Sequence, residues 1–83
     1  MNDKWVVYVL LSEVKKTRYV GFTSNLDRRL KEHNSGFNKS TKAYKPWKLV
    51  YKEIFELKLD ARKRELYLKS GIGREFLNDL LDL

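Results

Sequence analysis

The sequence of 83 residues has no cysteine, a single histidine and a single proline. The absence of cysteine excludes disulfides, thiolate zinc sites and thiol nucleophiles. One histidine cannot build a metal site from several imidazoles. No hydrophobic run approaches the ~18 residues of a membrane span, and the N-terminal residues MNDK do not resemble a signal peptide. We therefore expect a cytoplasmic protein without a membrane-spanning segment.

Glycine is also scarce, and there is no low-complexity tract, linker or internal repeat. These features predict one globular domain over residues 1–83 with a small core. What the chain has in excess is positive charge, with 18 Lys and Arg against 11 Asp and Glu and a formal net charge of +7. This charge favours a polyanionic partner, either nucleic acid or an anionic membrane surface, over a merely soluble basic protein.

The densest group of side chains suited to phosphate chemistry lies in residues 5–29. Residues 5–11 form an apolar run typical of a strand buried on both faces, and residues 18–22 predict a second strand that pairs with it in a hairpin. Opposed residues of an antiparallel pair project from the same face. Tyr8 and Tyr19 therefore share a face if Tyr19 opposes either Tyr8 or Leu10, and a register one residue off separates them. Gly21 either admits the close approach of another group or marks a bulge or strand end.

Capping signals predict a helix that starts after position 24 or 25, runs to about position 35 and is closed by the glycine at position 36. At 100° per residue, one stripe of this helix consists of Leu26, Leu30 and His33. Arg29 lies at the edge of this stripe, whereas Arg28 lies nearly opposite and faces solvent. Helical geometry therefore selects Arg29 as the arginine that can reach the sheet, either as a functional group or as a flanking residue whose stem covers apolar surface.

Residues 37–48, FNKSTKAYKPWK, combine aromatic rings and lysines with no acidic residue. The lysines are Lys39, Lys42, Lys45 and Lys48. Interleaved cations and rings suit a loop that follows a nucleic-acid backbone, and we expect the lysines to contact it. For the rings the structural alternative is stronger, because a tryptophan beside Pro46 is more typical of a loop anchored to the core.

The remaining residues predict one strand and two helices. The strand covers residues 47–55, with Leu49 and Tyr51 on one face and Val50 on the other. The first helix begins around residue 60 and ends at Gly71, and Gly73 opens a short last helix. The docking face of that last helix is expected to consist of Phe76, Leu77, Leu80 and Leu81. The order β-β-α-β-α-α predicts an α+β fold, in which helices pack against a small three-stranded antiparallel sheet.

The acidic residue of interest is Glu65, on the helix that precedes Gly71. The plainer interpretation is a surface ion pair with Lys69 at i, i+4. If the fold brings Glu65 close to both tyrosines and Arg29, the group suits phosphodiester hydrolysis. Arg29 would bind a non-bridging oxygen, Glu65 a hydrated divalent ion, and a tyrosine would orient or deprotonate water. A single carboxylate is compatible with magnesium, which keeps much of its water shell.

Five segments, in this order, resemble the GIY-YIG nuclease domain family. The half-motifs are VVY at residues 6–8 and YVG at residues 19–21, and TSNLDRRL follows at residues 23–30. HNSG at residues 33–36, PWKLVY at 46–51, RE at 64–65 and KSG at 69–71 continue the match. The resemblance covers nearly the whole chain, and the ordered set is specific where a single tripeptide is not.

The resemblance implies a three-stranded antiparallel sheet flanked by helices. It also implies DNA strand cleavage that depends on Mg²⁺ or Mn²⁺, with DNA repair or recombination as the expected setting. By position, Tyr8 and Tyr19 match the motif tyrosines, Arg29 the catalytic arginine and Glu65 the metal-binding glutamate. His33 falls where some members carry another tyrosine. Which tyrosine activates water is left open.

The sequence also departs from the family pattern. Val6 and Val7 replace the first glycine and isoleucine but preserve strand character. Phe22 stands where some members carry a basic residue, which predicts one phosphate contact fewer. We expect no appended DNA-reading domain, and therefore a structure-directed or weakly sequence-selective nuclease.

Two other function classes stay open at this point. One is a nucleic-acid-binding module of the same fold with little or no catalysis, and the other is a protein-interaction domain with a basic surface. Membrane binding is the least supported, because no helix combines a strong amphipathic moment with an entirely basic polar face. We expect no small-molecule cofactor, and a monomer is the default.

Overall fold

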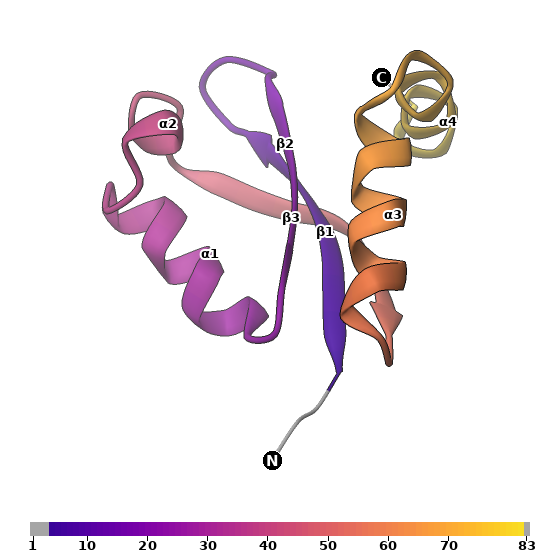
Figure 1. The fold of residues 1–83 in the computed structure, drawn as a ribbon. Helices are drawn as coiled ribbons and strands as arrows, with labels where there is room; N and C mark the ends of the chain where they lie inside the picture. Colours follow the sequence, from indigo (N-terminus) through magenta and orange to yellow (C-terminus); the bar gives the residue numbers. More distant parts are fainter. Residues whose placement is uncertain (1–3, 83) are drawn as a thin grey trace.

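The computed structural model describes residues 4–82, which form one antiparallel sheet and four helices (Figure 1). The strands are β1 (Trp5–Ser12), β2 (Arg18–Thr23) and β3 (Trp47–Phe55). β1 lies in the centre of the sheet, in the order β2-β1-β3. This central position explains why β1 reads as a continuous apolar run, since residues 6–10 are buried whichever face they project from.

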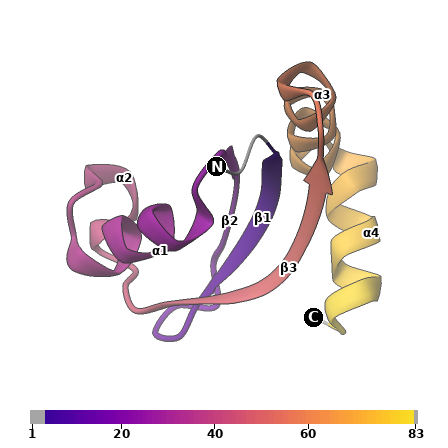
Figure 2. The ribbon, with the colours of Figure 1, turned by 90° about the horizontal axis from the view of Figure 1, so that it is seen from below.

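Helices cover both faces of the sheet (Figure 2). α1 (Leu26–Ser35) and α2 (Lys39–Lys42) lie on one side, and α3 (Lys58–Lys69) and α4 (Gly71–Leu81) lie on the other. The α+β fold with a three-stranded antiparallel sheet is therefore confirmed. The short helix α2 was not predicted; it lies within the lysine-rich segment and is capped by Asn38, whose side chain accepts from the Ser40 amide.

Each face of the sheet has its own hydrophobic core. On the α3 side, Val7, Val9 and Val20 pack against helix residues Ala61 and Leu68. The core on the α1 side is built from buried Val6, Tyr8, Leu10 and Trp47, with Tyr19, Leu26, Leu30, Tyr44 and Leu49 packed against it. The two motif tyrosines thus belong to the α1 side.

The register of the hairpin is one of the two that place both tyrosines on one face. Leu10 opposes Tyr19, and Tyr8 opposes Gly21. The N-cap of α1 is Asn25, whose side chain accepts from the amide of Arg28, and the helix ends at Gly36 in the left-handed conformation (φ 82°). These expectations are confirmed, with Asn25 rather than Ser24 as the cap.

The expected faces of β3 were wrong. A register shift between Val9 and Leu10 pairs them with Tyr51 and Leu49, so that Val50 has no partner of its own on β1. As in a β-bulge, this extra residue changes the alternation of side chains. Val50 and Tyr51 accordingly pack on the α3 side and Leu49 on the α1 side.

The boundaries predicted for the last two helices also need correction. α3 begins at Lys58, two residues before the expected start, and Gly71 is the first residue of α4 rather than a stop. Ser70 separates the helices, and its hydroxyl accepts from the Gly73 amide. Of the expected docking face, Leu77 is buried and Phe76 and Leu81 pack on the core, but Leu80 is 49% exposed.

α3 is held to the sheet by an ion pair with β3. The Arg64 guanidinium donates through Nε and Nη2 to the two carboxylate oxygens of Glu53, at 2.8 and 2.9 Å. Its guanidinium also lies 4.9 and 5.2 Å from the ring centroids of Tyr67 and Phe76. Bidentate pairs of this kind fix geometry as well as charge, so this contact orients the helix that carries Glu65. Among residues 4–82, no helix is long and apolar enough to span a membrane.

Two glycines of α4 give a matched test of the α3–α4 junction. A Cβ atom at Gly73 would lie 2.0 Å from the Tyr67 carbonyl oxygen, whereas one at Gly71 would meet nothing within 4 Å. We expect Gly73→Ala to lower the free energy of unfolding by about 1–3 kcal/mol or more, because backbone must move. Gly71→Ala should leave it unchanged or raise it by up to ~1 kcal/mol. Urea denaturation measures both, and equal effects would contradict the close packing of the two helices.

Candidate active site

The candidate site is built around the phenol of Tyr8, which crosses strand β2. Tyr8 is 1% exposed and lies opposite Gly21. A Cβ atom at Gly21 would be 2.7 Å from the Tyr8 Oη and 3.0 Å from the Tyr19 ring. Gly21 is therefore required for close approach, which decides between its two sequence-based interpretations. Because β2 is an edge strand, the phenol is directed toward the open edge of the sheet.

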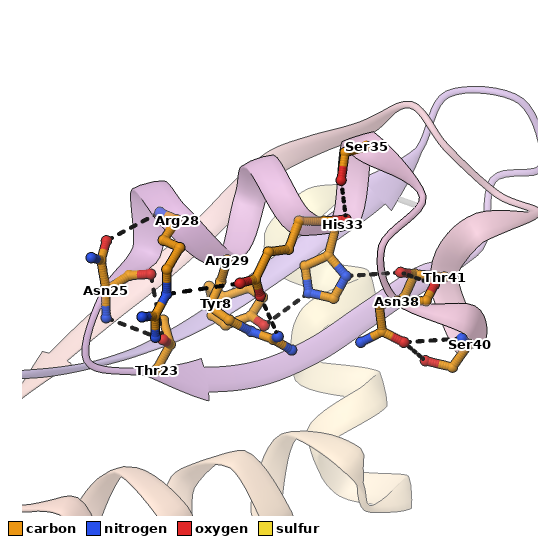
Figure 3. Close-up of polar contacts among 11 residues, drawn as sticks. Tyr8, Thr23, Asn25, Arg28, Arg29, His33, Ser35, Asn38, Ser40 and Thr41 are labelled. Carbon is orange, nitrogen blue, oxygen red and sulfur yellow. Dashed lines mark hydrogen bonds and ion pairs between the residues drawn. The ribbon is translucent and has the colours of Figure 1, made fainter.

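His33 holds this phenol from α1 (Figure 3). The Tyr8 Oη lies 3.0 Å from His33 Nε2, and His33 Nδ1 lies 2.9 Å from the Oγ1 of Thr41. The imidazole is fully buried, as its place in the apolar stripe of α1 predicts. Its burial, assisted by the nearby Arg29 charge, lowers the His33 pKa below the usual 6.5, so the ring is neutral at pH 7.

The positions of Arg29 and Arg28 on α1 agree with the predicted helical phase. The Arg29 side chain is 27% exposed against 64% for Arg28. Arg29 donates to Glu32 at 2.8 Å, and its guanidinium lies near enough to Tyr8 for each group to affect the pKa of the other. Burial acts against its charge, but Tyr8 and Glu32 outweigh that effect and raise the Arg29 pKa. A permanent cation therefore lies beside the phenol.

Tyr19 completes the aromatic group. Its ring centroid lies 4.7 Å from that of His33 and 6.2 Å from that of Tyr8. Burial raises the Tyr8 pKa to about 12, with Arg29 lowering it and the nearby Tyr19 and Glu65 adding to the increase. Tyr8 is thus a neutral phenol at pH 7, and the Glu65 carboxylate is close enough for its charge to affect it.

Glu65 approaches the same strand from α3. Three residues before it, Arg62 lies over the Phe22 ring, 6.0 Å from the centroid, and four residues after it, Lys69 shares a cavity with Tyr19. Glu65 therefore lies alongside β2 between these points, near Gly21. The site spans the edge of the sheet, with the phenol, imidazole and guanidinium on one side and the carboxylate on the other.

The ion pair with Lys69 that the plainer interpretation predicted is present, but Glu65 is buried rather than on the surface, at 5% exposed. Its two oxygens accept from Arg62 Nη1 at 2.7 Å and Lys69 Nζ at 3.1 Å. Both cations are about half exposed, at 52% and 47%, so each can turn toward solvent at little cost. Within residues 4–82, no three His, Cys, Asp or Glu side chains gather as a metal cluster. The donor set fits only an ion that keeps most of its waters.

The lysine-rich segment, residues 37–48, follows the C-terminal end of α1. Lys39, Lys42, Lys45 and Lys48 are all exposed. Trp47 is 4% exposed, and its indole N–H donates to the Thr41 carbonyl oxygen at 3.0 Å, so this ring anchors the segment to the core as the structural alternative predicted. Asn34 of α1 adds hydrogen bonds to the backbone of Trp47.

A second basic surface was missed from the sequence. A cavity of about 210 Å³ lies beside Tyr19, and its charged lining comes from Arg18, Lys69 and Arg74. Arg18 of β2 is far in the chain from Lys69 of α3 and Arg74 of α4, and no sequence pattern connects it to them. Arg18 donates to the Asn78 side chain and to the Arg74 carbonyl oxygen. Thr41 was missed for the same reason, because nothing in the lysine-rich segment marks it as a partner of His33.

The fold and this group of residues define a class: a small α+β domain with two motif tyrosines on a hairpin, an arginine on the next helix and a glutamate on a helix behind the sheet. The chain belongs to the GIY-YIG family, because the model of the GIY-YIG catalytic domain matches residues 4–75. Domains of this family are typical of endonucleases.

Sequence relatives and a solved structure agree with this family. The chain is 45% identical over 64 residues to a UPF0213 protein of Clostridium perfringens, covering 75% of this chain and 69% of that protein. A UPF0213 protein of Limosilactobacillus reuteri is 38% identical over 84 residues, which is 98% of this chain and 86% of the relative. The solution NMR structure of a UPF0213 protein from Bacillus halodurans is 34% identical, with a TM-score of 0.57 over 93% of this chain and 84% of that one.

The lowered pKa of His33 gives a test that needs no substrate. Above the unfolded-state value of 6.5, the ring is neutral in both states and the native contacts contribute fully. As the pH falls below 6.5, the unfolded chain binds the proton first, so the free energy of unfolding decreases. Urea denaturation between about pH 5 and pH 8 should show this decrease, by ~1.4 kcal/mol for each unit of pKa depression. His33→Gln should remove that component, and equal slopes in the two proteins would contradict the burial of a neutral imidazole.

Proposed function

We propose that this protein is an endonuclease that hydrolyses DNA phosphodiester bonds with the help of Mg²⁺ or Mn²⁺. The observation that carries the proposal is the position of Tyr8, hydrogen-bonded to neutral His33, beside the Arg29 cation and within electrostatic reach of Glu65. Membership of the GIY-YIG family supports the same reaction. We expect the enzyme to act on DNA structure or with weak sequence selectivity, in repair or recombination.

Arg29 binds the phosphate in this mechanism. Its guanidinium is a fixed cation with several donors, suited to the non-bridging oxygens whose charge grows in the transition state. Glu32 accepts from Nη1 and restrains the side chain, while the remaining donors stay available. Arg29 therefore both orients the phosphodiester and stabilises the charge that develops on it.

Tyr8 and His33 accept the proton of the attacking water together. Ionising Tyr8 alone at pH 7 would cost about 7 kcal/mol, because its pKa is about 12. A relay avoids a free phenolate: the water proton passes to Tyr8 Oη while the phenolic proton passes to His33 Nε2. The water oxygen forms the new bond to phosphorus, and the bond from phosphorus to the leaving oxygen breaks. Neutral His33 ends the step as an imidazolium.

Glu65 would hold the divalent ion through one or both carboxylate oxygens, with water as the other ligands. Such an ion would supply positive charge that stabilises the departing oxygen. Arg62 and Lys69 must first release the carboxylate, and in doing so they become available to DNA phosphates. The burial of Glu65 supports this role, since a buried carboxylate concentrates its field on a nearby cation.

A second candidate is a nucleic-acid-binding module of the same fold. The pairing of both Glu65 oxygens with Arg62 and Lys69 favours it, because a carboxylate held by two cations has less demand for a metal. The two candidates differ in turnover. A binding module retains salt-dependent DNA affinity but gives no cleavage with Mg²⁺ or Mn²⁺ on any duplex, branched or flapped substrate.

Arg29→Ala should reduce nicking of branched or flapped DNA by about 100- to 1000-fold, since one transition-state donor is removed. Glu65→Gln should abolish metal-stimulated nicking, and EDTA should do the same to the natural sequence. Arg28→Ala is the matched control, because it removes the same charge from the exposed side of the same helix. Gel assays with 5′-labelled DNA measure all of these. Cleavage that survives in both Arg29→Ala and Glu65→Gln, with the fold intact, would refute the assigned roles.

Neutralising positive charges on two surfaces tests which of them binds DNA. Replacing the four lysines of residues 37–48 with glutamine should weaken DNA binding and reduce its dependence on salt, by ~0.9 in log–log slope for each phosphate that is no longer neutralised. Arg74→Gln should weaken binding through the cavity beside Tyr19. The control protein carries the same number of lysine-to-glutamine changes at exposed positions elsewhere: Lys15, Lys31, Lys52 and Lys63. Fluorescence anisotropy at several salt concentrations measures the affinities. Equal losses of affinity in control and test proteins would exclude the lysine-rich segment as the footprint.

A further inference from the structure

The hydrogen bonds at the site form a chain from Tyr8 to the backbone of Asn38. The Tyr8 Oη bonds to His33 Nε2, His33 Nδ1 to Thr41 Oγ1, and Thr41 Oγ1 to the Asn38 carbonyl oxygen at 3.4 Å. Tyr8, His33 and Thr41 are each no more than 1% exposed. Every buried side-chain nitrogen and oxygen in residues 4–82 has a partner, so bulk water does not decide these proton positions.

The Asn38 end of the chain determines its direction. A carbonyl oxygen can only accept, so the Thr41 hydroxyl donates its proton to Asn38 and its oxygen accepts from His33 Nδ1. A neutral imidazole that carries its proton at Nδ1 accepts at Nε2, so the phenolic proton of Tyr8 is donated to His33 Nε2.

We propose that Thr41 is a positioning residue that holds neutral His33 as its Nδ1–H tautomer and so keeps Nε2 open for the proton of Tyr8. The catalytic consequence rests on the nuclease function proposed above. In the other tautomer, Nε2 carries a proton and donates to the phenol, so it cannot accept one. Thr41 acts as an aspartate does in hydrolytic triads, by holding the imidazole in one tautomer, but without a charge.

The side chain of Thr41 can be changed with little effect on the surrounding backbone. The Trp47 indole and the Tyr44 amide both donate to the carbonyl oxygen of Thr41, and its own amide donates to Asn38. These contacts do not involve the hydroxyl. Thr41→Val removes the acceptor with almost no change in shape, and Thr41→Ser restores the hydroxyl with a smaller side chain.

The tautomer is measured directly by NMR in the protein alone, without DNA or metal. Because His33 is the only histidine in the sequence, the ¹⁵N signals of its ring are unambiguous. At pH 8, the natural sequence and Thr41→Ser should show a protonated Nδ1 and an unprotonated Nε2. Thr41→Val should shift the ring toward the Nε2–H form, with the backbone spectrum otherwise preserved. An Nε2–H tautomer in the natural sequence would overturn the proposal. A ring that stays in the Nδ1–H form in Thr41→Val would overturn it as well.

The rate of DNA cleavage then tests whether the His33 tautomer matters for catalysis. Thr41→Val should lower the rate of metal-stimulated nicking about 10- to 100-fold at unchanged DNA affinity, and Thr41→Ser should restore most of it. A change of tautomer with no change in nicking would overturn the positioning role. If the natural sequence cuts no DNA, the nuclease proposal fails, and the ring spectra still decide whether Thr41 sets the tautomer.

Discussion

The buried hydrogen bond between Tyr8 and His33 is the constraint on which the rest of the site depends. It requires a residue without a side chain at position 21, because any Cβ there would collide with the phenol. It also requires α1 to present His33 to the sheet, which the apolar stripe of that helix and its Asn25 cap achieve. Burial keeps both partners neutral, since it raises the pKa of the phenol and lowers that of the imidazole. The pair is therefore neutral and able to pass a proton without first separating charge.

The position of Glu65 has a different origin, because α3 packs on the opposite face of the sheet. Its orientation follows from the pairing of Arg64 with Glu53 of β3 and from the close contact of Gly73 with the end of α3. In the proposed mechanism, groups on the two faces of this edge strand act on one phosphate. The lysine-rich segment is connected to the Tyr8–His33 pair through Thr41. This residue lies between two exposed lysines, Lys39 and Lys42, and contacts His33.

Local features of this fold were predictable from the sequence, and long-range ones were not. Periodicity and capping located the strands and α1, and helical phase separated Arg29 from Arg28. The faces of β3 were wrong because a one-residue bulge leaves no mark in an alternating pattern. Site residues from separate elements, such as His33 of α1 and Thr41 of α2, are brought together only by the fold. The burial of Glu65 also could not be read from its i, i+4 spacing to Lys69, which is as typical of a solvated helix face.

The central claim is that one phosphodiester binds across the edge of β2, between Arg29 and Glu65. The most direct measurement is a crystal structure of the complex with Mn²⁺ and a branched DNA whose phosphates carry sulfur substitutions that slow cleavage. We expect anomalous signal from manganese at the Glu65 carboxylate, with Arg62 and Lys69 turned away from it. We also expect a phosphate oxygen on Arg29, with Tyr8 Oη facing the side of phosphorus opposite the leaving oxygen. Manganese absent from Glu65, or DNA bound only along the lysine-rich segment with no phosphate at Arg29, would contradict the central claim.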